Sequence, residues 1–400
     1  MTFRAYKYRI YPTEEQQNYL LSNFGAVRFV WNALVEIFNS YSKCGPNRPL
    51  DLMYIKKQPG NEFLNDVISY AIHGRAGMFL EAKTRLFDKT KTYKMGSMKY
   101  KKKGIAKDSF YVPGTKIKVD LDNNLLKIPK MSAVKMKVDR KFAGIFKSVT
   151  ISMNKTGQYF ASILVEEEIS PLVKTGRSIG VDLGLNHLLV TSDGHQIENK
   201  KLFRKNQAKL AKQQRHLSRK HKGSVRFEKQ RKKVAVIQRK VADSRSWYLH
   251  NLSKWLVTEY DVICTEDLDI EAMRKRFGKS ISDAGWGILI GFLNYKCAWY
   301  GKTHVKIDRF EPSTKKCSAC GVLRESIPLT IRTWTCDACK KEHDRDFNAA
   351  INILHSGLNK LFGVKSEELP DHMRGEVVRP EVAIPNILAS SVKRISASAE

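Results

Sequence analysis

Four cysteines near the end of the chain restrict its local fold more than any other feature. They form two pairs, Cys317-x2-Cys320 and Cys336-x2-Cys339, separated by fifteen residues. Two such pairs commonly supply four thiolates to one tetrahedral ion. Because four thiolates leave no coordination position open, we expect a structural Zn2+ that holds this segment in shape and takes no part in catalysis. We expect His343 to be a polar neighbour of this site, since the cysteines already complete the shell.

The chain also carries a large excess of positive charge. It has 400 residues, and 71 Lys and Arg against 40 Asp and Glu give a formal net charge of +31. Such an excess repels itself unless a polyanion neutralises it, and nucleic acid fits best, although ribosomal and membrane-surface proteins share this property. The hydrophobic content of 42% is enough for packed cores in two or three units.

The sequence shows neither a secretory signal nor a membrane span. The first residues, MTFRAYKYRI, have no apolar core, and no uninterrupted apolar run reaches the ~18 residues that a span requires. We therefore expect a cytoplasmic protein with reduced thiols and no membrane contact.

The first part of the chain predicts one strand, then helices, then a sheet. Residues 3–11 alternate aromatic or apolar with basic side chains, as in a strand with one solvated face. Thr13 and Gln16 form a capping box, and helices should fill much of 14–90. Between about 96 and 170, short β-branched and aromatic runs predict a small β-barrel or curled sheet that includes the N-terminal strand. Its basic loop offers candidate nucleic-acid contacts: Lys99, Lys101 and Lys102.

A strongly basic segment covers residues 200–241. It holds seventeen Lys or Arg and one acid, Glu228, and is broken at Gly223. Apolar side chains at helical spacing on both sides of the break predict a helical hairpin with outward charges: Phe203, Leu210, Leu217, Val234, Ile237 and Val241. A merely solvated basic hairpin is the alternative, but so many cations favour an arm that contacts a duplex. Its candidate contacts are Arg215, Arg219, Arg231 and Arg239.

Three carboxylates stand at the ends of predicted elements in the second half. Asp182 follows the apolar run of the first of three antiparallel strands expected from Ser178 onward, and Glu266 ends the buried strand of 261–268. After a helix at 283–300 and a strand at 303–310, Asp346 begins the last helix. A buried carboxylate is costly without a cation, so we expect the three to converge and hold two Mg2+ ions roughly 4 Å apart. A pair of Mg2+ ions at this spacing activates water and stabilises the leaving oxygen when a phosphodiester is hydrolysed.

Neighbouring acids compete for these positions, and we rank them lower. Asp344 is expected to cap the last helix or to support the site from outside. Asp267 alternates to the opposite face of its strand, and Asp269 lies past the end of that strand.

At this point the sequence resembles TnpB, the transposon-encoded RNA-guided nuclease family also called OrfB, and more distantly the type V CRISPR effectors. The resemblance rests on YRIYPTEEQ, GVDLGLNHL around Asp182, TEDL around Glu266, SISDAGWG at 280–287, RTWTC at 332–336 and HDRDFNAAINIL. These motifs occur in the family's order and cover most of residues 1–360.

The resemblance implies an α/β multidomain protein. It assigns 176–312 and 345–365, with the basic hairpin of 200–241, to a RuvC-like nuclease of RNase H fold, and 313–344 to an inserted zinc ribbon. It equates 1–12 and 96–175 with a wedge β-barrel and 13–95 with a helical recognition lobe. We expect residues 366–400 to form a disordered tail.

The resemblance also implies catalytic residues and partners. Asp182, Glu266 and Asp346 match the family's catalytic acids, and Arg332 on the ribbon is expected to contact the scissile phosphate. Family members bind an RNA derived from the transposon end, pair its guide with double-stranded DNA beside a short transposon-adjacent motif, and cut both strands; no protein oligomer is required. The recognition region departs from the family pattern, so its candidate contacts are expectations from position alone: His73, Arg75 and Lys83.

Two other functions stay open at this stage. A guided repressor that has lost cleavage should lack one of the three acids, and all three are present. A strand-transferring transposase on the same fold would usually present two aspartates and then a glutamate, whereas the order here is Asp, Glu, Asp.

Overall fold

The computed structural model describes residues 1–44, 51–87, 97–104, 108–328, 330–363 and 392–394. The chain divides into two compact units, Met1–Glu168 and Ile169–Glu400. None of the helices in the described ranges combines the length and apolar character needed to cross a membrane. The predicted tail at 366–400 lies outside the described residues except for 392–394, which form strand β15 (Val392–Arg394).

The first unit is built on a seven-stranded antiparallel sheet with the order β2-β6-β7-β1-β5-β4-β3. Its strands are β1 (Thr2–Tyr11), β2 (Asp108–Pro113), β3 (Lys118–Asp120), β4 (Leu125–Lys127), β5 (Val134–Lys137), β6 (Ile145–Met153) and β7 (Tyr159–Glu167). The N-terminal strand lies inside the sheet between β7 and β5, which confirms its predicted membership. Within the described residues no pairing joins the edge strands β2 and β3, so the hydrogen bonds define an open row of strands.

Helices cover one face of this sheet. They are α1 (Glu14–Cys44), α2 (Leu52–Lys57) and α3 (Ser69–Leu86), with short 3-10 turns at Glu62–Asn65 and Gly114–Lys116. The predicted capping box is confirmed: the Thr13 amide donates to Gln16 Oε1, and the Gln16 amide donates to Thr13 Oγ1. Tyr8 and Ile10 of β1 are buried in one core with Phe24 of α1, because alternate residues of the strand face the helices.

The second unit contains a six-stranded mixed sheet with the order β12-β11-β8-β9-β10-β15. Its strands are β8 (Ser178–Asp182), β9 (His187–Thr191), β10 (His195–Glu198), β11 (Val262–Glu266) and β12 (Thr303–Ile307), with β15 on β10. Strands β8, β9 and β10 pair antiparallel, as predicted, whereas β8, β11 and β12 run parallel. The expected strand at 303–310 is shorter, since it ends at Ile307.

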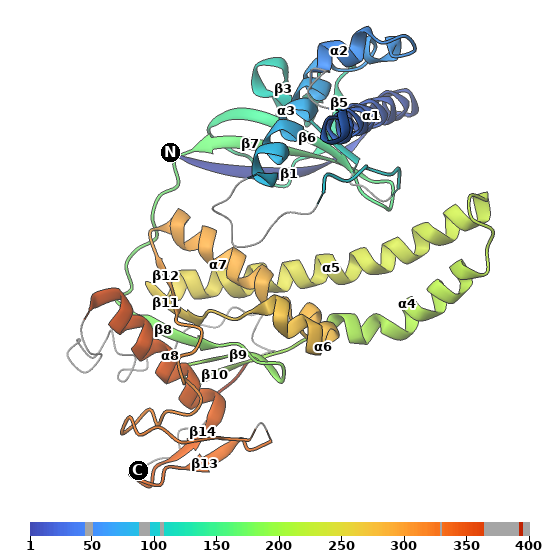
Figure 1. Ribbon diagram of the computed structural model, residues 1–400. Helices are drawn as coiled ribbons and strands as arrows, with labels where there is room; N and C mark the ends of the chain where they lie inside the picture. Colours follow the sequence, from blue (N-terminus) through green and yellow to red (C-terminus); the bar gives the residue numbers. More distant parts are fainter. Residues whose placement is uncertain (45–50, 88–96, 105–107, 329, 364–391, 395–400) are drawn as a thin grey trace. The chain divides into compact units, whose positions relative to one another are not determined.

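The basic segment forms the predicted helical hairpin (Figure 1). Helix α4 spans Leu202–Ser218 and α5 spans Val225–Glu259, and the break lies at Gly223, whose φ is +88°. Leu210, Val234 and Ile237 pack together between the helices, so the apolar spacing identified the contact correctly.

The end of the chain holds three further helices. The sequence prediction of one helix at 283–300 was wrong at its start: α6 (Ile270–Ala284) and α7 (Trp286–Tyr300) meet at Gly285, whose φ of +75° ends the first and begins the second. Helix α8 (Arg345–Phe362) follows a two-stranded ribbon of β13 (Thr333–Thr335) and β14 (Glu342–Asp344). In Figure 1, α8 crosses the sheet beside β8.

Candidate functional site

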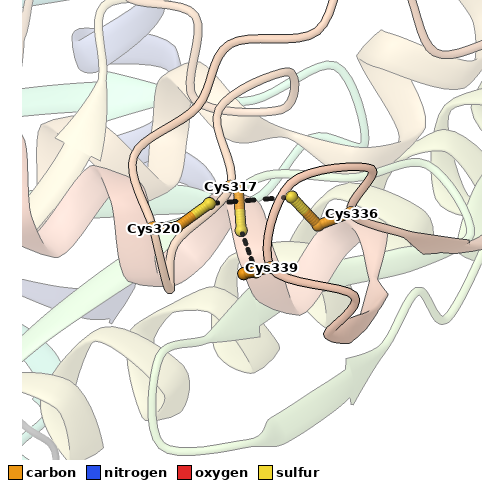
Figure 2. A group of neighbouring side chains, drawn as sticks. All are labelled: Cys317, Cys320, Cys336 and Cys339. Atoms are coloured by element: carbon orange, nitrogen blue, oxygen red, sulfur yellow. Dashed lines mark hydrogen bonds between the residues drawn. The ribbon is translucent and has the colours of Figure 1, made fainter.

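The four cysteines lie in one cluster, as their spacing predicts. Figure 2 shows their side chains pointing toward one another, and their sulfur atoms all lie within 4.8 Å. Cys317 Sγ is 3.7 Å from Cys339 Sγ, and Cys320 Sγ is 3.6 Å from Cys336 Sγ. A tetrahedral zinc ion with Zn–S bonds of about 2.3 Å places its sulfurs ~3.8 Å apart. The donor set and its spacing therefore fit Zn2+.

The cysteine pairs lie in two loops that share the same backbone conformation. The Gly321 amide donates to Cys317 O, and the Lys340 amide donates to Cys336 O, both at 2.9 Å. Gly321 and Lys340 have φ of +76° and +61°, which turns each loop back on itself. The backbone N–H of Cys339 is the main cause that lowers the pKa of Cys336 to about 6, so this loop favours a thiolate.

His343 is a neighbour of this cluster. Its Nε2 lies 3.1 Å from Cys317 Sγ, and its ring packs beside the buried Trp334. It is not among the four side chains that gather within 4.8 Å, which agrees with the expected place beside the site.

The sheet brings two of the three predicted carboxylates to one edge. Strands β8 and β11 are parallel neighbours with Val181 opposite Thr265, so the next residues, Asp182 and Glu266, end their strands side by side. Both carboxylates are partly buried. Because the carboxyl ends of parallel strands meet at one edge, the register alone makes this pair.

A glycine allows the last helix to approach these strands. A Cβ on Gly180 of β8 would lie 2.0 Å from Ala350 O and 2.7 Å from Leu354 N of α8. Only a residue without a side chain permits this contact of helix and strand backbones. It brings the first turn of α8, with Asp346, toward the ends of β8 and β11.

Burial and mutual charge raise the pKa of two of the three acids. The pKa of Asp182 is raised well above its usual range, first by burial and then by the charges of Glu266 and Asp346. Burial also raises the pKa of Glu266, against a hydrogen bond donated by the hydroxyl of Ser313. A site that disfavours its own ionised carboxylates is typical of a cation-binding pocket.

Two arginines form ion pairs with Asp346 in this structure. Arg332 Nη1 lies 3.1 and 2.9 Å from its two carboxylate oxygens, and Arg345 Nη2 lies 3.2 Å from Oδ1. Within the described ranges, the cysteines alone bring three or more metal-binding side chains within 4.8 Å. The three carboxylates are therefore more widely spread than ligands of one ion, but two ions about 4 Å apart accommodate a wider spread.

The neighbouring acids have structural partners. Asp344 caps α8 by accepting from the Phe347 amide at 2.9 Å, the role expected of it. Asp269 caps α6 through the Ala272 amide, and Asp267 pairs with Arg309 at 3.0 Å. Sequence reasoning missed two neighbours of the site: Ser313, which gave no signal, and Arg345, whose signal was its place directly before Asp346.

The candidate nucleic-acid contacts of the hairpin differ in their surroundings. Arg215 of α4 and Arg219, the residue that follows the end of α4, are both exposed. Arg231 is paired with Glu228 at 2.6 Å, and Arg239 with Asp243 at 3.0 Å.

The candidate nucleic-acid contacts of the first unit fall into two groups, side chains open to solvent and side chains that interact with the rest of the fold. Lys99, Lys102 and His73 are exposed, and Lys83 is half-buried. Two others are tied to the fold. The Nζ of Lys101 lies 3.6 Å from the ring centroid of Trp31, and burial lowers its pKa to about 8. Arg75 donates to Ser109 O at 2.6 Å.

Three family models match separate parts of the chain. Residues 1–45 match a "Helix-turn-helix domain" family model of the OrfB group, 162–276 match its "Probable transposase" model, and 286–353 match the "Cas12f1-like, TNB domain" model. The chain is 37% identical over 367 residues to a "Putative RNA-guided DNA endonuclease" of Streptomyces pristinaespiralis, with 89% of each chain covered. It is 28% identical to "Putative RNA-guided DNA endonuclease InsQ" of Escherichia coli K12, over 88% of this chain and 92% of that one.

A solved structure shares the fold. The Cas12f1 chain in a complex with guide RNA and target DNA matches 85% of this chain and 83% of its own length, with a TM-score of 0.51 and 14% identity. At that identity the match concerns the fold alone.

Proposed function

Because the chain belongs to the TnpB (OrfB) family of transposon-encoded proteins, we propose that it is an RNA-guided, Mg2+-dependent DNA endonuclease. Its partners are an RNA derived from the transposon end and a double-stranded target beside a short adjacent motif. The observation that carries this proposal is the pairing of Asp182 and Glu266 at the ends of neighbouring parallel strands, with Asp346 brought to them by α8.

In this proposal the three carboxylates hold the catalytic ions. When bound, Mg2+ activates water and stabilises the leaving oxygen of a phosphodiester. Ser313 orients Glu266 by donating to its carboxylate. Arg345 and Arg332 hold Asp346, and Arg332 is half-exposed, so its free donors can reach a phosphate of the strand that is cut.

We further propose a role for each part of the chain. Residues 176–312 and 345–365 form the RuvC-like nuclease, and the mixed sheet with α8 against it supports this. Residues 313–344 form a zinc ribbon that presents Arg332. Residues 1–12 and 96–175 act as the wedge and 13–95 as the recognition lobe. The hairpin of α4 and α5, rich in exposed cations, contacts the nucleic-acid duplex.

Loss of one carboxylate tests the catalytic assignment. We expect Asp182→Ala to lose at least ~1000-fold in Mg2+-dependent cutting while it copurifies with the same RNA as the wild type. Asp267→Asn is the matched control, since Asp267 adjoins Glu266 but pairs with Arg309. Sequencing of the copurified RNA supplies the guide, and a matching DNA target supplies the assay. Unchanged cutting by Asp182→Ala would remove the assignment, and strand joining of transposon ends in place of cutting would favour a transposase.

A further inference from the structure

A row of polar side chains on α8 holds the segment that leads from β12 to the first cysteine pair. This segment, residues 308–318, makes hydrogen bonds with α8 at every fourth position of the helix: Asn348, Asn352, Ser356 and Lys360. Residues four apart lie on one face of a helix, so the four side chains form a single row. The row and the segment run in opposite directions, because Lys360 binds Asp308 whereas Asn348 binds Lys316. The position of α8 therefore sets the position of this segment.

Asn352 is the member of the row that binds the backbone of Ser313. Its Nδ2 donates to Ser313 O and to Lys316 O, each at 2.7 Å. Both Asn352 and Ser313 are buried, with 4% and 3% of their surface exposed. A buried amide is costly unless it is hydrogen-bonded, and two carbonyl oxygens use both donors of one NH2 group. Asn352 therefore fixes the backbone at two points of the turn that contains Ser313.

The same turn directs the Ser313 side chain to the proposed Mg2+ site. Backbone hydrogen bonds shape the turn: the Ser313 amide donates to Glu311 O at 2.8 Å, and the Lys316 amide donates to Pro312 O at 3.1 Å. The Ser313 hydroxyl donates to the carboxylate of Glu266 at the end of β11. A continuous line of hydrogen bonds thus leads from the buried face of α8 to one of the three acids.

Other members of the row serve the segment in a different way. Ser356 donates to Glu311 Oε1 at 2.9 Å. Asn348 accepts from the Ser318 amide at 2.9 Å. These contacts end at groups outside the proposed Mg2+ site, whereas the contact of Asn352 continues to one of its ligands.

We propose that Asn352 is a positioning residue of the nuclease site. It holds the Ser313 backbone so that the Ser313 hydroxyl fixes the Glu266 carboxylate for Mg2+. Helix α8 thus serves the site twice, through Asp346 in its first turn and through Asn352 one and a half turns later. Loss of a partner that orients a metal ligand typically costs ~10- to 100-fold in metal affinity or activity. This inference deepens the proposed function and rests on it, since Mg2+ at these carboxylates is the cofactor named there.

Mg2+ binding can be measured without catalysis, as the rise in melting temperature of the RNA-bound protein with Mg2+ concentration. Asp182→Ala gives the background, because it removes a proposed ligand. Asn352→Leu keeps the branched shape of the side chain but removes its donors, and we expect its Mg2+ midpoint to rise about 10-fold. Ser313→Ala should raise the midpoint by the same factor. Ser356→Ala, one turn further along the same row, is the matched control and should keep the midpoint of the wild type.

The double variant Asn352→Leu/Ser313→Ala separates positioning from a general loosening of the fold. If Asn352 acts through Ser313, the double variant has the Mg2+ midpoint of Ser313→Ala alone, because the contact to Glu266 is lost only once. Independent effects would multiply to a rise of roughly 100-fold and would overturn the proposal. Melting without Mg2+ identifies the variants that fold. Asn352→Ala, which adds no bulk, carries the same expectation if the leucine variant does not fold.

The remaining outcomes separate this inference from the proposed function. A midpoint of the Asn352 variants equal to that of Ser356→Ala overturns the positioning role. If the wild type gains no more stability from Mg2+ than Asp182→Ala does and cuts no DNA, the proposed function fails as a whole. If the wild type binds Mg2+ and cuts, and only the Asn352 variants match the control, this inference fails alone.

Discussion

Arg332 of the zinc ribbon holds both carboxylate oxygens of Asp346, with Nη1 at 3.1 Å from Oδ1 and 2.9 Å from Oδ2. The backbone joins the same two segments, since Arg332 O accepts from the Arg345 amide at 2.7 Å. The cysteine cluster and the first turn of α8 are therefore one structural element. This explains why four cysteines directly precede the last acid in the sequence.

Replacing Arg332 should change metal binding and turnover in opposite ways. In Arg332→Gln the guanidinium no longer competes with a cation for Asp346, so we expect half-maximal cutting at a lower Mg2+ concentration. Maximal cutting should fall roughly 10- to 100-fold, because the contact that we propose between Arg332 and a phosphate is lost. Arg324→Gln is the control on the same ribbon, since Arg324 pairs with Asp337 and packs on Trp334. Mg2+ titrations of both variants are the measurement, and an unchanged midpoint for Arg332→Gln contradicts the competition.

Gly180→Ala should displace α8 from the sheet. The new Cβ would meet backbone atoms of Ala350 and Leu354, which cannot turn aside as a side chain does. We expect a loss of about 3 kcal/mol in stability, with loss of cutting because Asp346 moves. Gly291→Ala in α7 has nothing within 4 Å of its new Cβ and should be neutral or stabilising by up to ~1 kcal/mol. Urea unfolding and the cutting assay check both, and equal stability of the two variants would refute the close contact.

The ribbon should depend on its ion for folding. Its own core consists of little more than Cys317, Trp334, Cys336 and Ile327. A structural zinc site contributes roughly 10 kcal/mol or more, which so small a core cannot replace. Cys336→Ser should therefore lose bound zinc and expose 313–344 to protease, with loss of cutting as Arg332 is freed.

A buried cysteine away from the ribbon controls for the zinc experiment. Cys297→Ala, on the buried face of α7, should keep one zinc per chain by metal analysis. A full zinc content in Cys336→Ser would contradict the assigned ligand set.

Stability should rise between about pH 8 and pH 10 because of Lys296. Its Nζ is buried and donates to His250 O at 2.7 Å and Ser253 Oγ at 2.8 Å. Burial, with a smaller effect of Lys254, lowers its pKa from 10.5 to about 8. The unfolded chain therefore binds more protons in this range, so raising the pH relieves a cost of at most roughly 3 kcal/mol.

Removal of the buried amine should flatten this dependence. We expect the melting temperature of Lys296→Met to change little between pH 8 and pH 10. The control is Lys240→Met, at an exposed position of α5, and changes that both variants share are not due to Lys296. Parallel pH profiles of the two variants would show that Lys296 does not carry the effect.

Short-range patterns in the chain were sufficient for several elements. The capping box of Thr13 and Gln16, the cysteine spacing and the apolar periodicity on both sides of Gly223 each predicted the observed structure. The boundary of α6 and α7 was missed because the predicted helix began at 283, whereas Gly285 at positive φ ends α6 and begins α7.

The sequence by itself predicted the groups to which we assign chemistry: two cysteine pairs, three acids at the ends of elements and a basic hairpin. The cysteine pairs and the hairpin each lie within a segment of about twenty to forty residues, and each acid stands at the end of its own short element, so local helical or strand geometry sets their positions. Only the tertiary structure decided that Arg332 and Arg345 hold Asp346, that Ser313 reaches Glu266, and that Arg9 faces Lys137. Such contacts depend on strand register and on the close approach of α8 at Gly180, which are set by packing between segments far apart in the chain.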